Sequence, residues 1–146
     1  MVSGFLPSAI SAGQRGEIQR IVKGGHRSMQ NQSYRNPIIS GYNPDPSICR
    51  VGDDYYIVNS SFEYFPGVPV YHSRNLVNWE LLGHCLTTDE QLPLEKCRPS
   101  GGIFAPTLRY HDGWFFMTTT NVSSGGNFIV HSKEPDKGWS DPVRID

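Results

Sequence analysis

The chain lacks several features that would define a function class at once. Thirteen Lys and Arg residues against fourteen Asp and Glu leave a formal net charge of −1, so nothing points to nucleic acid or an anionic membrane as the partner. Three cysteines, an odd number without metal-ligand spacing, argue against a zinc site. No apolar run is long enough to cross a bilayer. A neutral ligand fits this composition better.

The amino-terminal segment is not expected to act as an export signal. The opening "MVSGFLPSAISAGQRG" has no basic n-region, and Pro7 interrupts its short apolar run. Cys49, Cys85 and Cys97 are interpreted as buried or free thiols of a reducing compartment, and a cytoplasmic location is expected. Residues 1–35 are rich in Gly, Ser, Gln, Arg and Lys, and they are predicted to form a flexible extension.

Composition and turn signals favour an all-β fold over residues 36–146. Aromatic residues make up 12% of the chain, and its 15 Gly and 11 Pro suit short strands joined by tight turns. Four strands are predicted in "SICRV", "YYIVNSSF", "VPVYHS" and "WELLGHCL", and four more in "TLRYH", "WFFMTTTN", "FIVHSK" and residues 139–145. The polar stretch "HCLTTDEQLPLEKCRPSGG" joins the two sets and is expected to help shape a binding site.

The two sets of strands form a repeat. A shift of about sixty residues aligns Pro46-Ser-Ile with Pro106-Thr-Leu, Asp54-Tyr-Tyr-Ile with Gly113-Trp-Phe-Phe, and Val70-Tyr-His-Ser with Ile129-Val-His-Ser. Four-stranded antiparallel repeats with periodic aromatic and glycine residues are typical of β-propeller blades. The chain is therefore predicted to carry two blades, and two blades cannot close a ring.

The repeat separates scaffold from candidate functional residues. His72 and His131 occupy equivalent positions and are interpreted as hydrogen-bonded structural groups. Trp79 aligns with Trp139 in the same way, so both are predicted to pack between blades. Positions that differ in chemical class between the copies are the candidates for function.

Asp45 is such a position and becomes the candidate catalytic residue. It lies between Pro44 and Pro46, which limit its backbone conformations, and it aligns with Ala105, so the blade does not need a carboxylate there. Because the first strand of a blade lies innermost, an acid at its entrance is expected at the mouth of the central channel, where a ligand would sit. The alternative is a simple Asx-Pro turn.

Aromatic residues close to this carboxylate indicate a sugar site. Phe62, Tyr64 and Phe65 follow the second predicted strand, and Phe104 lies in "GGIFAP". Aromatic faces beside a lone carboxylate, with no basic cluster, are typical of a sugar platform, because C–H faces stack on rings while hydroxyls find polar groups. The alternative is that these rings belong to the hydrophobic core.

Two stretches carry a family resemblance. "NPIISGYNPDPSICRVGDDYYIVNSSFEYFPGVPVYHSRNLVNWELLGH" and "GGIFAPTLRYHDGWFFMTT" resemble the amino-terminal part of glycoside hydrolase family 43, in particular its β-xylosidases and α-L-arabinofuranosidases. The similarity covers residues 36–146. It implies a five-bladed β-propeller, of which this chain covers about the first two blades. It also implies inverting exo-hydrolysis of xylo- or arabino-oligosaccharides without a cofactor.

Residue by residue, the resemblance makes Asp45 the general base and places Phe62, Phe104 and Ala105 in the substrate site. Phe104 stands where the family usually has Trp in a GIWAP motif; it keeps a stacking face but loses the indole N–H. The family's general-acid Glu and pKa-modulating Asp come from later blades, so this chain alone is expected to be inactive. A non-catalytic, carbohydrate-binding propeller remnant is the alternative.

Overall fold

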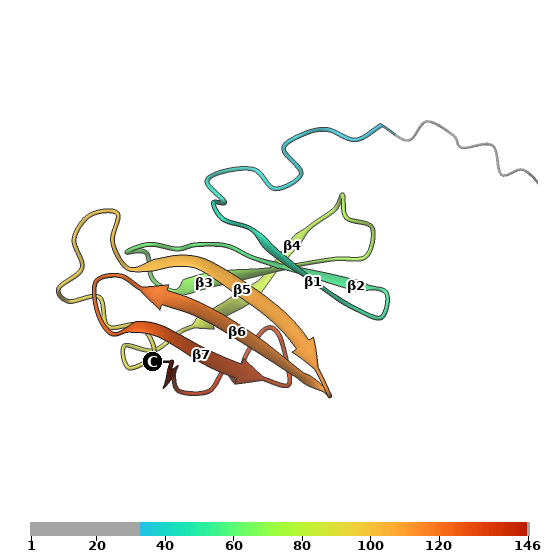
Figure 1. Ribbon diagram of the computed structural model, residues 1–146. Coiled ribbons are helices and arrows are strands. Elements are labelled where there is room, and N and C mark those ends of the chain that lie inside the picture. Colours follow the sequence, from blue (N-terminus) through green and yellow to red (C-terminus); the bar gives the residue numbers. More distant parts are fainter. Residues whose placement is uncertain (1–32, 146) are drawn as a thin grey trace, which may run out of the picture. The chain divides into compact units, whose positions relative to one another are not determined.

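Two four-stranded antiparallel sheets make up the computed structural model, which describes residues 33–145. The first sheet contains β1 (Ser47–Val51), β2 (Asp54–Val58), β3 (Gly67–Ser73) and β4 (Glu80–Leu86). The second contains β5 (Ile103–His111), β6 (Trp114–Asn121), β7 (Gly126–Ser132) and β8 (Val143–Arg144). Strands that follow each other in the chain are neighbours in each sheet, and Figure 1 shows β5, β6 and β7 side by side in the second one. The predicted extension over residues 1–35 falls almost wholly outside the described residues.

The predicted number and order of strands are confirmed, but several boundaries differ. The second strand is predicted to run to Phe62, whereas β2 ends at Val58. The sequence predicts a strand from Thr107, whereas β5 begins at Ile103, because the chain there pairs with both Asn121 and Phe62. The sequence also predicts a strand over residues 139–145, whereas the paired strand β8 has only two residues. Trp139 lies before this strand and packs into the core instead.

The strand registers confirm the repeat and correct one of its alignments. Tyr55 lies opposite Ser73, and Phe115 lies opposite Ser132, so Tyr55 is equivalent to Phe115, 60 residues further on. The sequence alignment pairs Tyr55 with Trp114 and is therefore wrong by one residue. Its cause is the two-residue hairpin turn, which reads Gly-Asp in the first sheet and Asp-Gly in the second.

Buried side chains from both sheets form one hydrophobic core. Along β6, buried and half-buried residues alternate with the period of two that a strand requires. The sheets meet where β1 contacts β5, and the Tyr56 ring meets the edge of the Phe115 ring at 5.1 Å between centroids. Trp139 lies in this core, whereas its repeat partner Trp79 is half-buried. The core also includes Cys49, Val58, Val68, Val70, Cys85, Leu86, Leu92, Ile103, Leu108, Met117, Phe128 and Val130.

The two equivalent histidines have different surroundings. His72 lies between two carboxylates, with Nε2 2.7 Å from Asp54 Oδ1 and Nδ1 2.9 Å from Glu80 Oε1, which confirms its hydrogen-bonded role. The hydrogen bond to Asp54, supported by the one to Glu80, raises the pKa of His72 against the opposing effect of burial. His131 instead packs against two aromatic rings of β6, so its structural role is one of packing.

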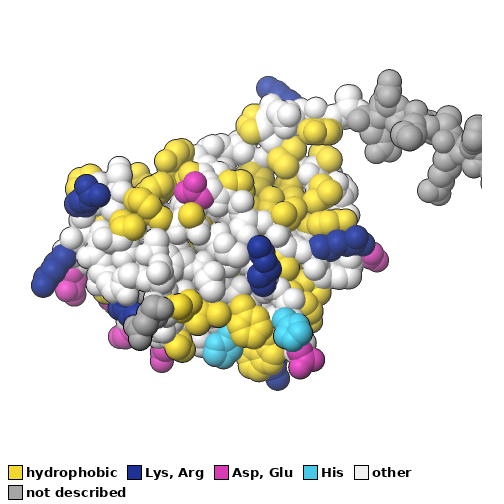
Figure 2. All heavy atoms as spheres, in the orientation of Figure 1, with side chains coloured by type: hydrophobic (Ala, Val, Ile, Leu, Met, Phe, Trp, Pro, Cys, Tyr) yellow, Lys and Arg dark blue, Asp and Glu magenta, His cyan; other side chains and the backbone are white. Residues whose placement is uncertain are grey.

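Apolar side chains also remain on the surface of this unit. Ile48 is 51% exposed and alternates on β1 with the buried Cys49, so it marks the face of the first sheet that lies away from the core. Val143, on the edge strand β8, is 57% exposed. Figure 2 shows hydrophobic side chains spread over the visible face of the molecule. Both a sheet face and a sheet edge are thus open to further packing.

The cysteines carry no disulfide: all three are free thiols, Cys49 and Cys85 buried and Cys97 half-buried. Complete burial raises the pKa of Cys85 well above its ordinary value, so this thiol stays neutral. None of the described residues belongs to a helix long and apolar enough to span a membrane.

Candidate active site

Asp45 lies directly before β1, at the strand entrance that the sequence predicts. Its φ of 51° is left-handed, a conformation that Asp tolerates better than most residues because its short side chain is polar. Its Oδ2 accepts a hydrogen bond from Ser60 Oγ at 2.6 Å, from a residue 15 positions further along the chain. The alternative of a simple Asx-Pro turn does not describe this contact, because the carboxylate bonds a separate strand end and not its own bend.

Hydrogen bonds also hold the segment that precedes this carboxylate. Pro44 O accepts two of them from the residues that follow β2, at 3.1 Å from Ser60 N and at 3.2 Å from Asn59 Nδ2. Asn43 Oδ1 accepts a third from Tyr71 Oη at 3.2 Å. The proline rings and these contacts together leave the carboxylate little freedom to reorient, which is what a functional group needs for precise placement.

Ala105 confirms the structural equivalence that the repeat predicts. Its φ is 39°, so both copies of the repeat have a left-handed residue at this place. Thr119 Oγ1 donates to Phe104 O at 2.7 Å, just as Asn59 Nδ2 donates to Pro44 O in the first copy. The hydrogen bond to the preceding carbonyl recurs in both sheets. It forms in the second copy although that copy has a methyl group where the first has a carboxylate.

Three aromatic rings cluster in the segments that adjoin the Asp45–Ser60–Ala105 contacts. The Phe62 ring meets the Phe104 ring at 5.0 Å and 65°, and it stacks on the Tyr42 ring at 6.0 Å and 27°. Reciprocal backbone hydrogen bonds between Phe62 and Ile103, both 3.0 Å, join the two sheets at this point. Phe62 and Phe104 are half-buried and Tyr42 is 76% exposed, so this cluster is not simply part of the core.

The structure therefore brings together all four residues that the sequence places in the site: Asp45, Phe62, Phe104 and Ala105. Tyr64 and Phe65, the remaining aromatic candidates, are exposed and so lie outside the core. Sequence reasoning missed Tyr42 and Ser60. The available signals were an aromatic residue three positions before the carboxylate and a pair of serines where the apolar run of the second strand stops.

The donor set of this cluster suits a neutral ligand with hydroxyl groups. Within residues 33–145, no group of three His, Cys, Asp or Glu side chains could hold a metal ion. The cluster instead presents one carboxylate and several aromatic faces. Such a surface can accept hydrogen bonds from hydroxyls and pack against C–H groups.

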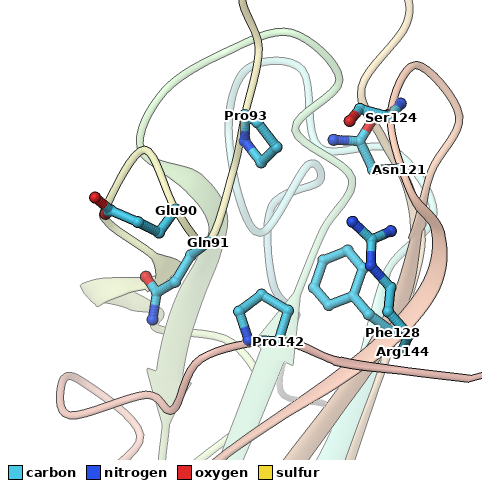
Figure 3. Close-up of a pocket in the computed structure, with 8 residues that line it drawn as sticks. All are labelled: Glu90, Gln91, Pro93, Asn121, Ser124, Phe128, Pro142 and Arg144. Carbon is cyan, nitrogen blue, oxygen red and sulfur yellow. Dashed lines mark hydrogen bonds between the residues drawn. The ribbon is translucent and has the colours of Figure 1, made fainter.

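The long connection between β4 and β5 helps to shape a cavity away from the Asp45 cluster. It packs on the second sheet, where Gln91 Nε2 donates to the carbonyl oxygens of Trp139 and Ser140 at 2.9 and 3.1 Å. Beside it lies a cavity of about 120 Å³, lined by Glu90, Gln91, Pro93, Asn121, Ser124, Phe128, Pro142 and Arg144 (Figure 3). Hydrogen bonds from its own backbone and from Thr88 lower the pKa of Glu90, so this carboxyl group is a poor proton donor. The cavity shares no residue with the Asp45 cluster.

The two sheets are consecutive in the chain, each has four antiparallel strands, and they share one core. These features define blades of a β-propeller protein, with a carboxylate and aromatic rings where the two blades adjoin. Comparison with known proteins identifies the family. The chain belongs to glycosyl hydrolases family 43, whose family model matches residues 34–146.

Individual relatives agree with this assignment. The non-reducing end α-L-arabinofuranosidase BoGH43B of Bacteroides ovatus is 58% identical over 122 residues, which are 81% of this chain and 23% of that protein. A xylosidase/arabinosidase of Butyrivibrio fibrisolvens is 58% identical over 110 residues, 75% of this chain and 21% of that protein. Among solved structures, the Bacteroides ovatus xyloglucan PUL GH43B matches with a TM-score of 0.74 at 60% identity, over 75% of this chain and 23% of that one. The chain thus spans less than a quarter of the length of these relatives.

Proposed function

We propose that this chain supplies the general base and part of the substrate site of an inverting exo-glycosidase that acts on xylo- or arabino-oligosaccharides. The observation that carries the proposal is the anchored Asp45 carboxylate, which Ser60 connects to Ala105, the residue after Phe104 in the aromatic cluster of Tyr42, Phe62 and Phe104. The printed functions of the relatives, arabinofuranosidase and xylosidase/arabinosidase, support the substrate class.

Asp45 acts in its ionised form. Inverting hydrolysis places a carboxylate and a protonated carboxylic acid on opposite faces of the sugar, roughly 6.5–9.5 Å apart. Asp45 takes a proton from water, and the water oxygen bonds to the anomeric carbon. The bond to the leaving oxygen breaks, and the acid protonates that oxygen. The left-handed, proline-flanked backbone holds the base in one position for this step.

The other three site residues contact the sugar. Phe62 and Phe104 present half-buried rings whose faces pack against C–H groups of the substrate. Ala105 is exposed beside them and leaves room where a larger side chain would intrude. Selectivity between xylose and arabinose depends on how these surfaces fit the ring, and Phe104 offers less area than an indole would.

The general acid and the remaining blades of a five-bladed ring come from outside these 146 residues. The chain covers only 23% of the length of its Bacteroides ovatus relative. Ile48 and Val143 leave apolar surface exposed that further blades would cover. Because loss of a general acid typically reduces the rate by about 10²- to 10⁴-fold, we expect the isolated chain to be inactive.

The test joins this chain to the part of the Bacteroides ovatus relative that lies beyond the matched segment. The hybrid should hydrolyse a nitrophenyl xyloside or arabinofuranoside. Asp45→Asn should lower kcat by about 10²- to 10⁴-fold and leave thermal unfolding almost unchanged, since Ala105 shows that this backbone accepts a neutral side chain. The matched control is Asp53→Asn, because the Asp53 side chain is 97% exposed in the β1–β2 turn. Near-normal turnover of the Asp45→Asn hybrid would remove Asp45 from the mechanism.

A carbohydrate-binding protein without chemistry is the second candidate. The aromatic cluster lies complete within this chain, although the general acid does not. Calorimetric titration of the chain with xylobiose and arabinobiose measures this directly. Binding by the chain, combined with no hydrolysis by the hybrid, would favour this second candidate.

A further inference from the structure

Ser60 occupies the junction between the candidate base and the second sheet. It is only 5% exposed, and its Oγ makes two short hydrogen bonds. Oγ lies 2.6 Å from Asp45 Oδ2 and 2.6 Å from Ala105 N. One hydroxyl group therefore connects the carboxylate in the first copy of the repeat to the backbone of the equivalent residue in the second.

The chemistry of the three groups sets the direction of both hydrogen bonds. A backbone N–H can only donate, so the Ser60 oxygen accepts from Ala105. The single hydroxyl proton of Ser60 is then directed to Asp45 Oδ2. The amide, the hydroxyl and the carboxylate form a chain in which each donor strengthens the next bond. The Ser60 hydroxyl group cannot turn away from Oδ2 without breaking this series of hydrogen bonds.

We propose that Ser60 is a positioning residue that selects Asp45 Oδ1 as the oxygen that takes the proton from water. Engagement of Oδ2 fixes the plane of the carboxylate, and within residues 33–145 no hydrogen bond engages Oδ1. The inference rests on the proposed role of Asp45 as the base. Ser60 itself does not react; it acts by holding Asp45 in one orientation, and a small error of orientation is costly for a proton transfer.

The internal repeat supports this assignment. Thr120 pairs with Phe104 in the second sheet and lies 60 positions after Ser60, so the two hydroxyl residues are equivalent. In the second copy the residue equivalent to Asp45 is Ala105, whose methyl group cannot accept a hydrogen bond. The contact to a carboxylate is thus specific to the first copy. Thr120 also shows that a threonine can be built at this place in the fold.

Two variants isolate the hydroxyl group of Ser60. Ser60→Ala removes it, and Ser60→Thr keeps it. Ser61→Ala is the matched control, because Ser61 is also buried but its hydroxyl has no hydrogen-bond partner within the described residues.

Amide hydrogen exchange, followed by NMR on the 146-residue chain, tests the geometry. Ser60→Ala should accelerate exchange of the Ala105 amide by about tenfold or more, because that N–H loses its acceptor. Ser60→Thr and Ser61→Ala should keep its protection. Unchanged protection of Ala105 in Ser60→Ala would overturn the proposed connection.

Kinetics of the hybrid enzyme test the positioning role of Ser60. Ser60→Ala should lower kcat by about 10- to 100-fold while KM changes by less than about twofold. Ser60→Thr should restore most of the lost kcat, a rescue that a purely structural defect would not show. If Asp45→Asn is inactive but Ser60→Ala turns over like Ser61→Ala, the positioning role is wrong and the base remains assigned. If Asp45→Asn stays active, the proposed function itself fails.

Discussion

Gly102→Ala tests how closely the two sheets approach each other beside the candidate site. Gly102 has a φ of 78°, and an added Cβ would overlap the carbonyl oxygen of Phe62 and lie 2.5 Å from its carbonyl carbon. Side-chain carbons do not approach other atoms within 3.0 Å in real structures. Because the obstacle is backbone and not the end of a flexible side chain, either the loop after β2 or the start of β5 must move.

The expected cost follows from the contacts at this point. A Cβ at left-handed φ costs roughly 1–2 kcal/mol. Displacement also breaks the reciprocal hydrogen bonds between Phe62 and Ile103, each worth about 1 kcal/mol, and loosens the fully buried Ile103 side chain. The free energy of unfolding should fall by about 3–5 kcal/mol. Gly113→Ala is the matched control: its φ is 83°, but no atom lies within 4 Å of the added Cβ, so only the conformational cost applies.

Urea denaturation of the chain, followed by tryptophan fluorescence, measures the difference. Trp139 is buried in the core and reports its exposure on unfolding. Gly102→Ala should lose about 2–3 kcal/mol more than Gly113→Ala. Equal losses in the two variants would refute the reasoning, because the approach of the Phe62 carbonyl would then place no limit on position 102.

Three further outcomes are expected. The hydrogen bond of His72 to Asp54, then that to Glu80, raises the pKa of His72, so its contribution to stability is full below the unfolded value of about 6.5 and fades as pH rises through the raised folded value. His72→Gln should therefore cost more stability in urea at about pH 5.5 than at about pH 8.5, and equal costs would contradict this linkage. Met117→Ala, at a fully buried site, should lower the free energy of unfolding by about 2–5 kcal/mol in the same assay, and a loss under about 1 kcal/mol would show that the core does not depend on it. Phe104→Trp should tighten saccharide binding by about 2- to 10-fold in calorimetric titration, and weaker binding would argue against a stacking role.

The strands and the repeat could be predicted because both depend on residue patterns within short stretches of the sequence. Alternating apolar residues and turn signals mark each strand, and two similar hairpins mark the repeat. The alignment of the two repeats was wrong by one residue at the hairpin turns, where the local sequence does not fix the pairing. The hairpin turns carry glycine at different positions, and only the pairing of Tyr55 with Ser73 and of Phe115 with Ser132 settles which residues are equivalent.

The site was predicted in part for the same reason. Asp45 stood out because its repeat partner is Ala105, a comparison that needs no structure. Ser60 did not stand out, because a serine at a strand end has many explanations until its hydroxyl is seen 2.6 Å from that carboxylate. Tyr42 was missed because its ring gains significance only when it is seen to stack on Phe62.

The sequence by itself determined the class of fold, the number of strands, the family and the carboxylate to which chemistry is assigned. These depend on residue type and on spacing along the chain. The tertiary structure decided what surrounds that carboxylate: a left-handed backbone at Asp45, a hydroxyl from Ser60, and a link to Ala105, which is 45 positions beyond that serine. Such contacts join segments that become neighbours only when two sheets pack together, and no local pattern encodes the distance between them.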